Sequence, residues 1–495
     1  MSIREPILLD APGTGESPAP LSAVGPVLLA VVTILCCFVA YALAVGNENQ
    51  VIAGVVGILG LVIVIARPFW GLLFFVGLLY TRPEETIPSL AGMHLPLVIS
   101  LTTLVGLLLQ MALKGEWFVR SPVNFLILGF VGVATASAVQ HGNWLDALQD
   151  TGRLGVLLLL FLNLVRTESG YETVVTSILV FTGFLAAFSA YLYFTGAALQ
   201  YDDGSGVVER AQATGIFSDP NDLAATMVPA LALALFRAYK ASRYRRWAYA
   251  GLSALIVSAI FLTNSRGGLL ALMVVVGTFI FLITRRKVLA ALLAGVVCAG
   301  LLFGTSGRMT NFDSQEASSN QRFWYWSNGY DQLVESPVLG VGYAGFLEIN
   351  GGMTAHNSFV LCFTELGLVG YTCWMGCLYC CFQGGRRPAR KLPATETALT
   401  PLTAARIGCA GMLVACFFLS RTYAPVTYLI MGLPLTASSL TASSLTASSL
   451  TASSLTPGNA GPEAASRWHL RDTMWLLGLT IASIAFIKAF SDHMK

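Results

Sequence analysis

Long apolar runs separated by short polar stretches recur along nearly the whole chain. A membrane-spanning helix needs roughly 20 predominantly apolar residues, and about fourteen segments approach that length, so the pattern predicts an all-α, polytopic transmembrane helical bundle of about 12–14 spans. The apolar runs lie near residues 22–46, 50–66, 69–81, 97–114, 122–139, 152–165, 173–197, 222–238, 247–263, 267–284, 288–304, 357–382, 404–420 and 473–490. The long break at 305–356 predicts a loop outside the spans that contains short helices.

The composition indicates that the solvent of this chain is lipid. Of the 495 residues, 55% are hydrophobic and only 11% are charged, and no water-soluble fold could bury so large a share of apolar side chains. The formal net charge of +3 comes from basic residues in short loops, where such residues orient the spans. We therefore expect membrane lipids, and no nucleic acid, as the surroundings of the chain.

Three basic loops predict the orientation of the spans, because Lys and Arg in short loops are retained in the cytoplasm. These loops contain Arg237, Lys240, Arg243, Arg245 and Arg246, then Arg285, Arg286 and Lys287, then Arg386, Arg387, Arg390 and Lys391. Counting spans from them places both termini in the cytoplasm. The same count places four segments on the outer side of the membrane: residues 198–221, 264–267, 305–356 and the stretch after Arg421.

The two ends of the sequence differ from its apolar middle. Residues 1–21 are rich in Pro and Gly and predict a disordered cytoplasmic tail. Near the other end LTASS occurs four times in a row, and a five-residue period fits neither a helix face nor a strand. We therefore expect a transmembrane domain over 22–434, a low-complexity linker over 435–466 and a C-terminal transmembrane helix over 473–490.

Two of four outward polar motifs open helices. In the first, Arg210 precedes the DPND segment at 219–222, where Pro suits a first helical turn and Asp or Asn can cap free N–H groups. In the second, Arg266 lies in a tight turn and is followed by Gly267, which allows close backbone approach. Both motifs also fit a plain reading, in which an arginine at a helix start is solvated or extends to the membrane interface.

The other two motifs lie within and just after the long outer loop. Arg322 leads the aromatic run FWYW, which can lie along the membrane interface or stack on sugar rings. His356 and Asn357 open a long apolar run. A histidine there suits general-base catalysis near neutral pH, although a histidine that only caps the helix fits the pattern as well.

If the four motifs converge in space, they specify a chemistry. Three guanidinium groups suit a pyrophosphate ligand, because arginine binds phosphate oxygens through two parallel hydrogen bonds. The histidine would then activate an acceptor hydroxyl. Fixed arginines can stabilise the charge on a departing lipid pyrophosphate without a metal.

The same motifs resemble the O-antigen ligase and polymerase family. The resemblance rests on residues 210–224, SRG at 265–267, Arg322 with SPVLGVGYAGF, and AHNSF followed by ELGLVG, and it covers residues 170–380. It implies a GT-C-like glycosyltransferase of the bacterial inner membrane that uses no metal or other cofactor. The donor is then an undecaprenyl-pyrophosphate-linked glycan on the periplasmic side, and the acceptor is the lipid A core for a ligase or a glycan for a polymerase.

The resemblance also assigns roles to residues. His356, as the general base, and Arg266 are the expected catalytic residues. The expected substrate-binding residues are Arg210, Arg322, Asn221 and Asn357, the two asparagines by orienting their neighbours. Glu365 is nine residues beyond His356, so we expect it on the opposite helix face, paired with another helix.

Other functions fit parts of the same pattern. A polymerase or a protein O-oligosaccharyltransferase would use the same donor with a different acceptor. A polysaccharide or lipid transporter would also have many spans, but transporters usually show repeated halves and polar groups near the bilayer midplane. In this sequence the polar motifs gather at one face, and the LTASS segment has no counterpart in the family.

Overall fold

The computed structural model describes residues 48–202, 207–284, 295, 317–383, 399–452, 468 and 470–493. The chain divides into two compact units, Met1–Ile63 and Val64–Lys495. The described part of the first unit is helical and forms most of α2 (Glu48–Ala66). The predicted tail at 1–21 lies outside the described residues.

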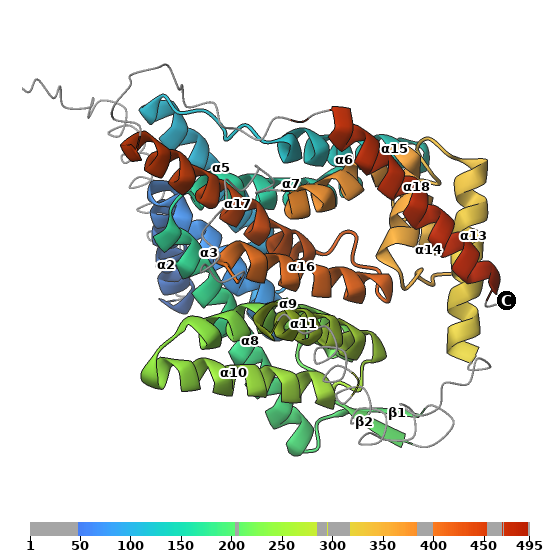
Figure 1. Cartoon of the computed structure of the whole chain (residues 1–495), viewed down its shortest axis with the longest axis horizontal. Coiled ribbons are helices and arrows are strands. Elements are labelled where there is room, and N and C mark those ends of the chain that lie inside the picture. Colours follow the sequence, from blue (N-terminus) through green and yellow to red (C-terminus); the bar gives the residue numbers. More distant parts are fainter. Residues whose placement is uncertain are drawn as a thin grey trace, which may run out of the picture. The chain divides into compact units, whose positions relative to one another are not determined.

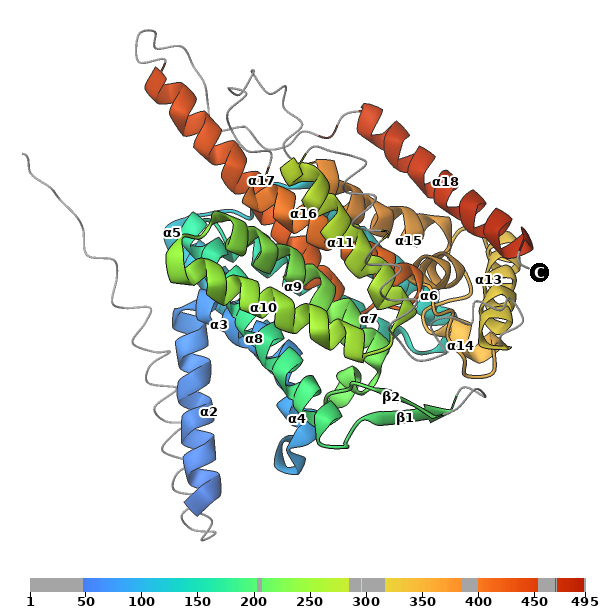
Figure 2. The same ribbon diagram turned by 60° about the horizontal axis from the view of Figure 1, so that its bottom comes forward.

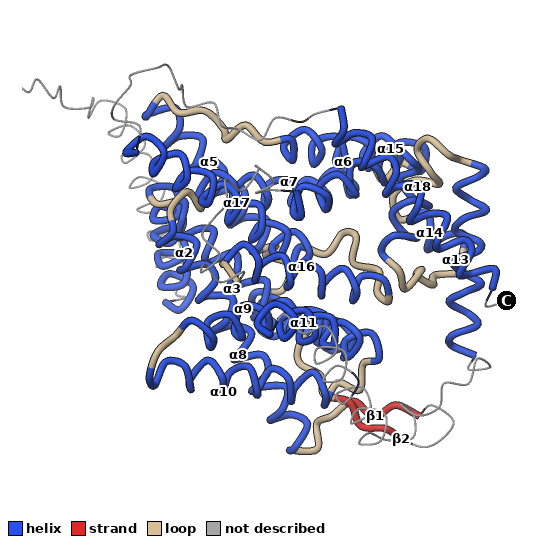
Figure 3. Tube along the Cα trace, viewed as in Figure 1, coloured by secondary structure: helices blue, strands red, loops and turns tan. Residues whose placement is uncertain are grey.

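Helices make up almost all of the described second unit (Figure 3). The long helices are α3 (Pro68–Thr81), α5 (Leu95–Lys114), α6 (Pro122–Ala138), α7 (Trp144–Leu164), α8 (Glu168–Phe194), α9 (Pro220–Lys240), α10 (Arg243–Leu262), α11 (Arg266–Thr284), α13 (Ala317–Glu335), α15 (Ser358–Gln383), α16 (Pro401–Phe417), α17 (Pro425–Ala452) and α18 (Leu470–His493). The short elements are α4 (Pro83–Thr86), η1 (Pro88–Leu90), η2 (Val139–His141), η3 (Gly215–Ser218), α14 (Gly345–Ile349) and the antiparallel strands β1 (Leu199–Asp202) and β2 (Val207–Arg210).

Seven helices of the described chain are long and apolar enough to cross a membrane. They are Leu95–Lys114, Pro122–His141, Glu168–Phe194, Pro220–Lys240, Arg266–Thr284, Ser358–Gln383 and Leu470–Asp492. The predicted all-α, polytopic class is thus confirmed. The number is below the expected 12–14 because some apolar runs form shorter helices, such as the 14-residue α3, and two runs, near 22–46 and 288–304, lie almost wholly outside the described residues.

Helix α9 forms the centre of the second unit. Of the candidate spans it is the most enclosed, with 78% of its apolar window buried against 22% for α18. It packs against α8, α10, α11 and α16, and Figures 1 and 2 show these helices around it. The α9–α16 contact is close, since a Cβ on Gly408 would lie 2.9 Å from the Pro229 carbonyl oxygen, as expected where small residues let membrane helices approach.

A second group of helices surrounds α15. It packs against α6, α13, α17 and α18, and both ribbon views show α18 beside α13 and α15 (Figures 1 and 2). The predicted C-terminal helix at 473–490 corresponds to α18. The region expected to be a long loop with short helices contains the 19-residue α13 as well as the short α14.

The prediction of a linker over 435–466 is wrong for the first part of that range, because α17 continues through the repeats to Ala452. The hydroxyls at the start of the repeat bond to carbonyls within the helix. Thr436 donates to the Gly432 carbonyl at 2.9 Å, and Ser438 donates to that of Leu435 at 2.8 Å. Ser and Thr can thus enter a helix interior by bonding back one turn, whatever the period of the sequence. Residues 453–467 lie outside the described chain.

The loops of the second unit gather at two opposite ends of its helices. At one end Arg166 pairs with Glu116 at 2.7 Å, which joins the loops after α7 and α5. At the other end His141 is hydrogen-bonded to the Val341 carbonyl at 2.8 Å. The four motifs of the sequence lie at this second end, called the motif end below.

Candidate functional site

The β1–β2 hairpin carries Arg210 to the turn between α10 and α11. The Ala211 amide donates to the Leu262 carbonyl at 2.8 Å, and the Asn264 amide group donates to the Glu209 carbonyl at 3.0 Å. These bonds fix the end of β2 on the turn. As a result Arg210 is held next to the motif that contains Arg266.

The Arg210 side chain is almost fully buried and links two motifs directly. Its Nε donates to the Thr263 carbonyl at 2.9 Å, and its Nη2 donates to Asn221 Oδ1 at 3.0 Å. Ser265, which precedes Arg266, donates to the same Asn221 oxygen at 2.8 Å. Asn221 therefore joins the first and second motifs.

The start of α9 is built by its own acidic residues. Asp219 caps the helix by accepting from the Asn221 backbone N–H at 2.8 Å and from its side-chain amide at 3.0 Å. Asp222, in the first turn, is buried and forms an ion pair with Arg421. These residues tie α9 to the loop between α16 and α17, which contains Arg421.

Two helix N-termini meet at this point. A Cβ on Gly268, in the first turn of α11, would collide with that of Ala224 in α9, and one on Gly267 would lie 2.9 Å from Phe418 Cβ. The first turns of α9 and α11 are therefore side by side. Both helix ends carry the partial positive charge of the helix dipole, which favours an anion, while Asp219 and Ser265 accept hydrogen bonds from amides of these first turns.

His356 lies just before α15 and is half-buried. Its neighbours are fixed on both sides, because the Trp326 indole donates to the Ala355 carbonyl at 2.9 Å and Asn357 caps α15 by accepting from Phe359 N–H at 2.9 Å. Its backbone is left-handed, with φ of 47°.

The electrostatic surroundings of His356 connect the remaining motifs. Burial lowers the pKa of His356 below its usual 6.5, and the Arg322 guanidinium lowers it further, whereas the Asp219 carboxylate opposes this shift. Arg322 of α13 and Asp219 of the α9 cap are therefore both near enough to act on the imidazole. Residues from three of the four motifs surround one histidine.

Two glycine-rich motifs fit each other across a break in α15. Gly367 interrupts that helix at φ 60°, ψ −167°. The turn segment 337–342 satisfies the interrupted backbone: the Val341 amide donates to the Thr364 carbonyl at 2.9 Å, and the Leu368 amide donates to the Pro337 carbonyl at 2.8 Å. The segments SPVLGVGY and ELGLVG thus form one unit that fixes α15 relative to the preceding loop.

Residues 251–375 match the family model described as O-antigen ligase. These residues belong to the O-antigen ligase family. The predicted resemblance is confirmed, and the matched part contains Arg266, Arg322, His356 and Asn357. No curated protein and no solved structure matches the chain.

The ligase-family domain and the elements around it bring two further arginines to the motif end. Arg421 pairs with Asp222. Burial lowers its pKa to about 10, Asp219 opposes this shift, and Arg82 adds to it. Arg82 itself forms an ion pair with Glu85. Neither residue was predicted from the sequence. Arg421 directly precedes a stretch expected to face outward, and Arg82 directly follows the apolar run at 69–81.

Gly215 shows how close the Arg82 loop comes to the first motif. This glycine has φ of 63°, and a Cβ there would collide with the Glu85 carboxylate. The loop after α3 therefore lies against η3, directly before the start of α9. Its approach could not be predicted from the sequence, because 130 residues separate Glu85 from Gly215.

The structure shows the hydrogen-bond partners of Asn221, Asn357 and Glu365. Asn221 and Asn357 both use their side-chain oxygens within the protein, and Asn357 is fully buried. This favours positioning roles for both. Glu365 accepts from the Tyr423 hydroxyl at 2.7 Å and from the Phe346 amide at 3.3 Å, so its partners belong to the α16–α17 loop and to α14.

Metal ligands were not expected in this site. Among the residues that the structure describes, no group of three or more His, Cys, Asp or Glu side chains is placed to hold a metal ion. The charged groups that act on His356 are the Arg322 guanidinium and the Asp219 carboxylate. The buried Arg210 guanidinium is hydrogen-bonded to Asn221 at the start of α9, and guanidinium groups suit an anionic ligand.

Proposed function

We propose that this membrane protein transfers an undecaprenyl-pyrophosphate-linked glycan to an acceptor hydroxyl on the periplasmic face, as an O-antigen ligase. The observation that carries the proposal is the combination of a half-buried histidine with a lowered pKa and an arginine that acts on it. The family match at residues 251–375 supports ligase or polymerase chemistry in general.

His356 is suited to act as the general base. Because burial and Arg322 lower its pKa, the imidazole is neutral at pH 7 and can accept a proton. A general base must also be held in a fixed orientation. The Trp326 bond to the preceding carbonyl and the Asn357 cap provide this.

The pyrophosphate of the donor would bind among Arg210, Arg266 and Arg322, at the paired N-termini of α9 and α11. The dipole of a helix attracts a phosphate group to its N-terminus. Arginines add hydrogen bonds that strengthen as charge develops on the leaving group. Arg82 and Arg421 lie near each other at the same end, and each is paired with a carboxylate, that of Glu85 and that of Asp222.

The proposed reaction is a single displacement at the sugar. The acceptor hydroxyl oxygen attacks the anomeric carbon of the donor glycan and forms the new glycosidic bond, while His356 takes the hydroxyl proton. The bond between the anomeric carbon and the pyrophosphate oxygen breaks. Its electron pair leaves with undecaprenyl pyrophosphate, whose added charge the arginines stabilise.

The test is glycan transfer in detergent from purified undecaprenyl-pyrophosphate donor to lipid A core, with His356→Ala and Arg266→Ala compared at equal folded yield. Loss of a general base is expected to lower the rate about 10²–10⁴-fold. His94→Ala is a matched control, because His94 is an exposed histidine at the motif end, and it should retain the wild-type rate.

The acceptor decides between the related functions. Transfer to lipid A core that is lost in both variants supports the ligase. Lengthening of the donor glycan would assign the protein as a polymerase, and transfer to a protein would assign an O-oligosaccharyltransferase. Movement of intact donor across vesicles without transfer to any acceptor would overturn the proposal in favour of a transporter.

A further inference from the structure

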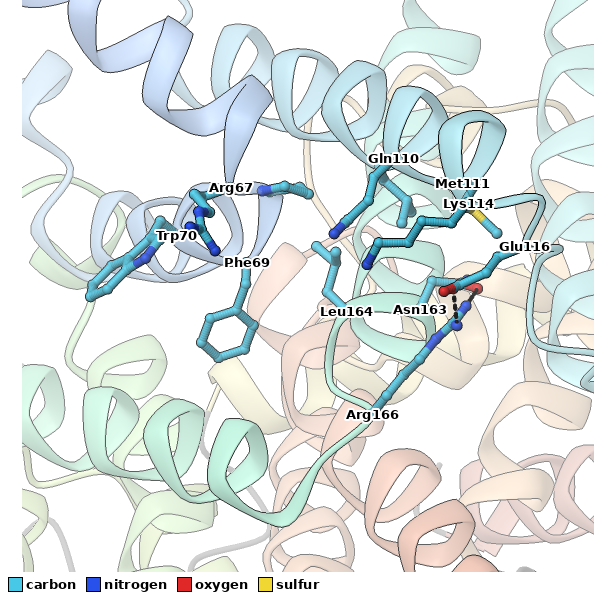
Figure 4. A pocket seen from close by; sticks show the side chains of 12 residues that line it. Arg67, Phe69, Trp70, Gln110, Met111, Lys114, Glu116, Asn163, Leu164 and Arg166 are labelled. Carbon is cyan, nitrogen blue, oxygen red and sulfur yellow. Dashed lines mark hydrogen bonds and ion pairs between the residues drawn. The ribbon is translucent and has the colours of Figure 1, made fainter. Parts of the chain in front are cut away.

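A cavity of about 400 Å³ lies at the end of the second unit opposite the motif end (Figure 4). It is formed where α3 begins and where α5 and α7 end. Its lining residues are Arg67, Pro68, Phe69, Trp70, Leu107, Gln110, Met111, Lys114, Glu116, Asn163, Leu164 and Arg166. This cavity contains none of the residues of the proposed transferase site.

The polar lining of the cavity is mainly cationic. Three cationic side chains line the cavity, those of Arg67, Lys114 and Arg166. The lining contains one carboxylate, that of Glu116, which pairs with Arg166 at 2.7 Å. Figure 4 shows the Lys114 and Gln110 side chains extending from α5 into the space between Arg67 and Arg166. The excess of positive charge and the amide donor suit a phosphate group.

The loops that form the cavity are fixed by Asn163. Its side-chain oxygen accepts from the Val119 amide at 2.9 Å and from Arg166 Nη2 at 3.3 Å, while its amide donates to the Leu159 carbonyl at 2.8 Å. The loop after α5 and the loop after α7 are thereby held together. The cavity is a built feature rather than a gap between independent loops.

The surface next to the cavity is apolar and exposed. On α3, Trp70 is 60% exposed and Phe74 is 56% exposed. On α5, Leu109 and Leu113 are also exposed. In a membrane protein such side chains face acyl chains, and a Trp near a helix end marks the level of the lipid head groups. The cationic cavity is therefore continuous with a lipid-facing surface.

We propose that this cavity binds the phosphate of an anionic phospholipid head group, with its acyl chains along the exposed faces of α3 and α5. The charge distribution of the sequence assigns this end to the cytoplasm, where basic pockets between membrane helices bind anionic lipid. The inference does not depend on the proposed transfer reaction. Continuity with the apolar surface favours a lipid over a soluble phosphate.

The experiment is native mass spectrometry of delipidated, full-length protein titrated with palmitoyl-oleoyl phosphatidylglycerol or the matching phosphatidylcholine. The test variant is Arg67→Gln with Lys114→Gln. We expect its affinity for phosphatidylglycerol to fall about tenfold, with phosphatidylcholine binding unchanged. Arg67→Lys with Lys114→Arg should retain binding within about twofold, because it keeps both charges.

A matched control removes two charges elsewhere at the same end. Arg245 and Arg246 are exposed at the start of α10, and Arg245→Gln with Arg246→Gln should leave phosphatidylglycerol affinity within about twofold of wild type. Equal loss in both double variants would indicate a diffuse surface effect and overturn the proposal, as would no loss in the cavity variant.

A competition arm identifies the source of the phosphate. Inorganic phosphate and glycerol 3-phosphate should not displace phosphatidylglycerol at equal concentration, because they lack the acyl chains. Displacement from wild type at equal concentration would show that the cavity takes a soluble phosphate and would overturn the lipid assignment. Gel filtration and Tm of each variant establish that it is folded.

Discussion

His356 is held in a backbone conformation that a non-glycine residue adopts at a cost on the order of 1–2 kcal/mol. The residues on either side keep it there: the Trp326 indole fixes Ala355, and Asn357 caps α15. Burial lowers its pKa most, the Arg322 guanidinium lowers it further, and the Asp219 carboxylate opposes the shift. This arrangement makes the pH dependence of the protein a direct test of the site.

We expect transfer activity to fall on the acid side as His356 gains a proton, with the inflection below pH 6.5, because its pKa is lowered in the folded protein. Arg322→Gln removes one cause of the lowering, so its inflection should move to higher pH. Asp219→Asn removes the opposing charge, so its inflection should move to lower pH. Both are measured from the pH profile of the residual rate.

These two variants control for each other. A purely structural disturbance would lower the rate without opposite shifts of the inflection. Asn also caps helices well, so Asp219→Asn should preserve the start of α9. Shifts in the same direction, or no shift in either variant, would contradict the assignment of His356 as the titrating base.

At the scale of elements, the break in α15 and the segment that crosses it form the frame of the site. Gly367 and Gly340 both have positive φ, and Cβ atoms there would collide with the carbonyl oxygens of Val338 and Thr364. The conformation of Gly367, at φ 60° and ψ −167°, is one that essentially only glycine adopts. The motifs therefore need glycine for close approach of two backbones.

Gly367→Ala is expected to destabilise the protein by about 1–3 kcal/mol through backbone strain, and by more through the collision with the Val338 carbonyl. Gly132→Ala is the matched control, because Gly132 lies within α6 with open space around its Cβ position. The measurement is the Tm and the yield of monodisperse protein. A Tm for Gly367→Ala equal to that of the control would contradict the strain argument.

The structure of α17 allows us to predict how deletion of LTASS copies affects stability and activity. The copies are identical, so removing one copy leaves the sequence of the first copy in place and shortens only the far end. Tm and transfer activity should then be unchanged. Removing all four copies deletes Leu435, Thr436 and Ala437, which are buried, and should lower the Tm. Equal effects of both deletions would indicate that burial at the first copy has no role.

At the scale of the whole molecule, the polar groups divide between two ends of one helical assembly. The motif end carries the candidate transferase site, and the opposite end carries the cationic cavity. Helix α3 connects them: Arg67 precedes its first residue and Arg82 follows its last. With 14 residues it is about 21 Å long, so the two sites are well separated.

Orientation in the membrane can be measured by labelling. His94 is exposed at the motif end, so the cysteine of a His94→Cys variant should react with a membrane-impermeant maleimide added to intact, right-side-out spheroplasts. A cysteine at Arg245, exposed at the other end, should react only after permeabilisation. The seven cysteines of the described residues are buried or half-buried, and the parent protein gives the background. The reverse pattern would overturn the predicted topology.

Much of this protein is determined by local sequence. Apolar length alone predicts the membrane class, because a bilayer requires long runs whose backbone groups are satisfied within the helix. The helix starts at Pro220 and just after His356 could also be predicted, since caps depend on neighbouring residues. The repeat region shows the limit of such reasoning, because period alone did not reveal that the hydroxyls bond within α17.

What only the tertiary structure decided is which of the predicted residues meet and what joins them. The bond from Arg210 to Asn221, the pairing of Asp222 with Arg421 and the approach of the Arg82 loop all join parts of the chain that lie apart in sequence. Such contacts depend on how helices pack, and helix packing is governed by side-chain shape across elements rather than by local pattern. The sequence therefore determined the membrane class and the candidate chemistry, whereas the packing of α9, α13 and α15 decided which groups act on His356.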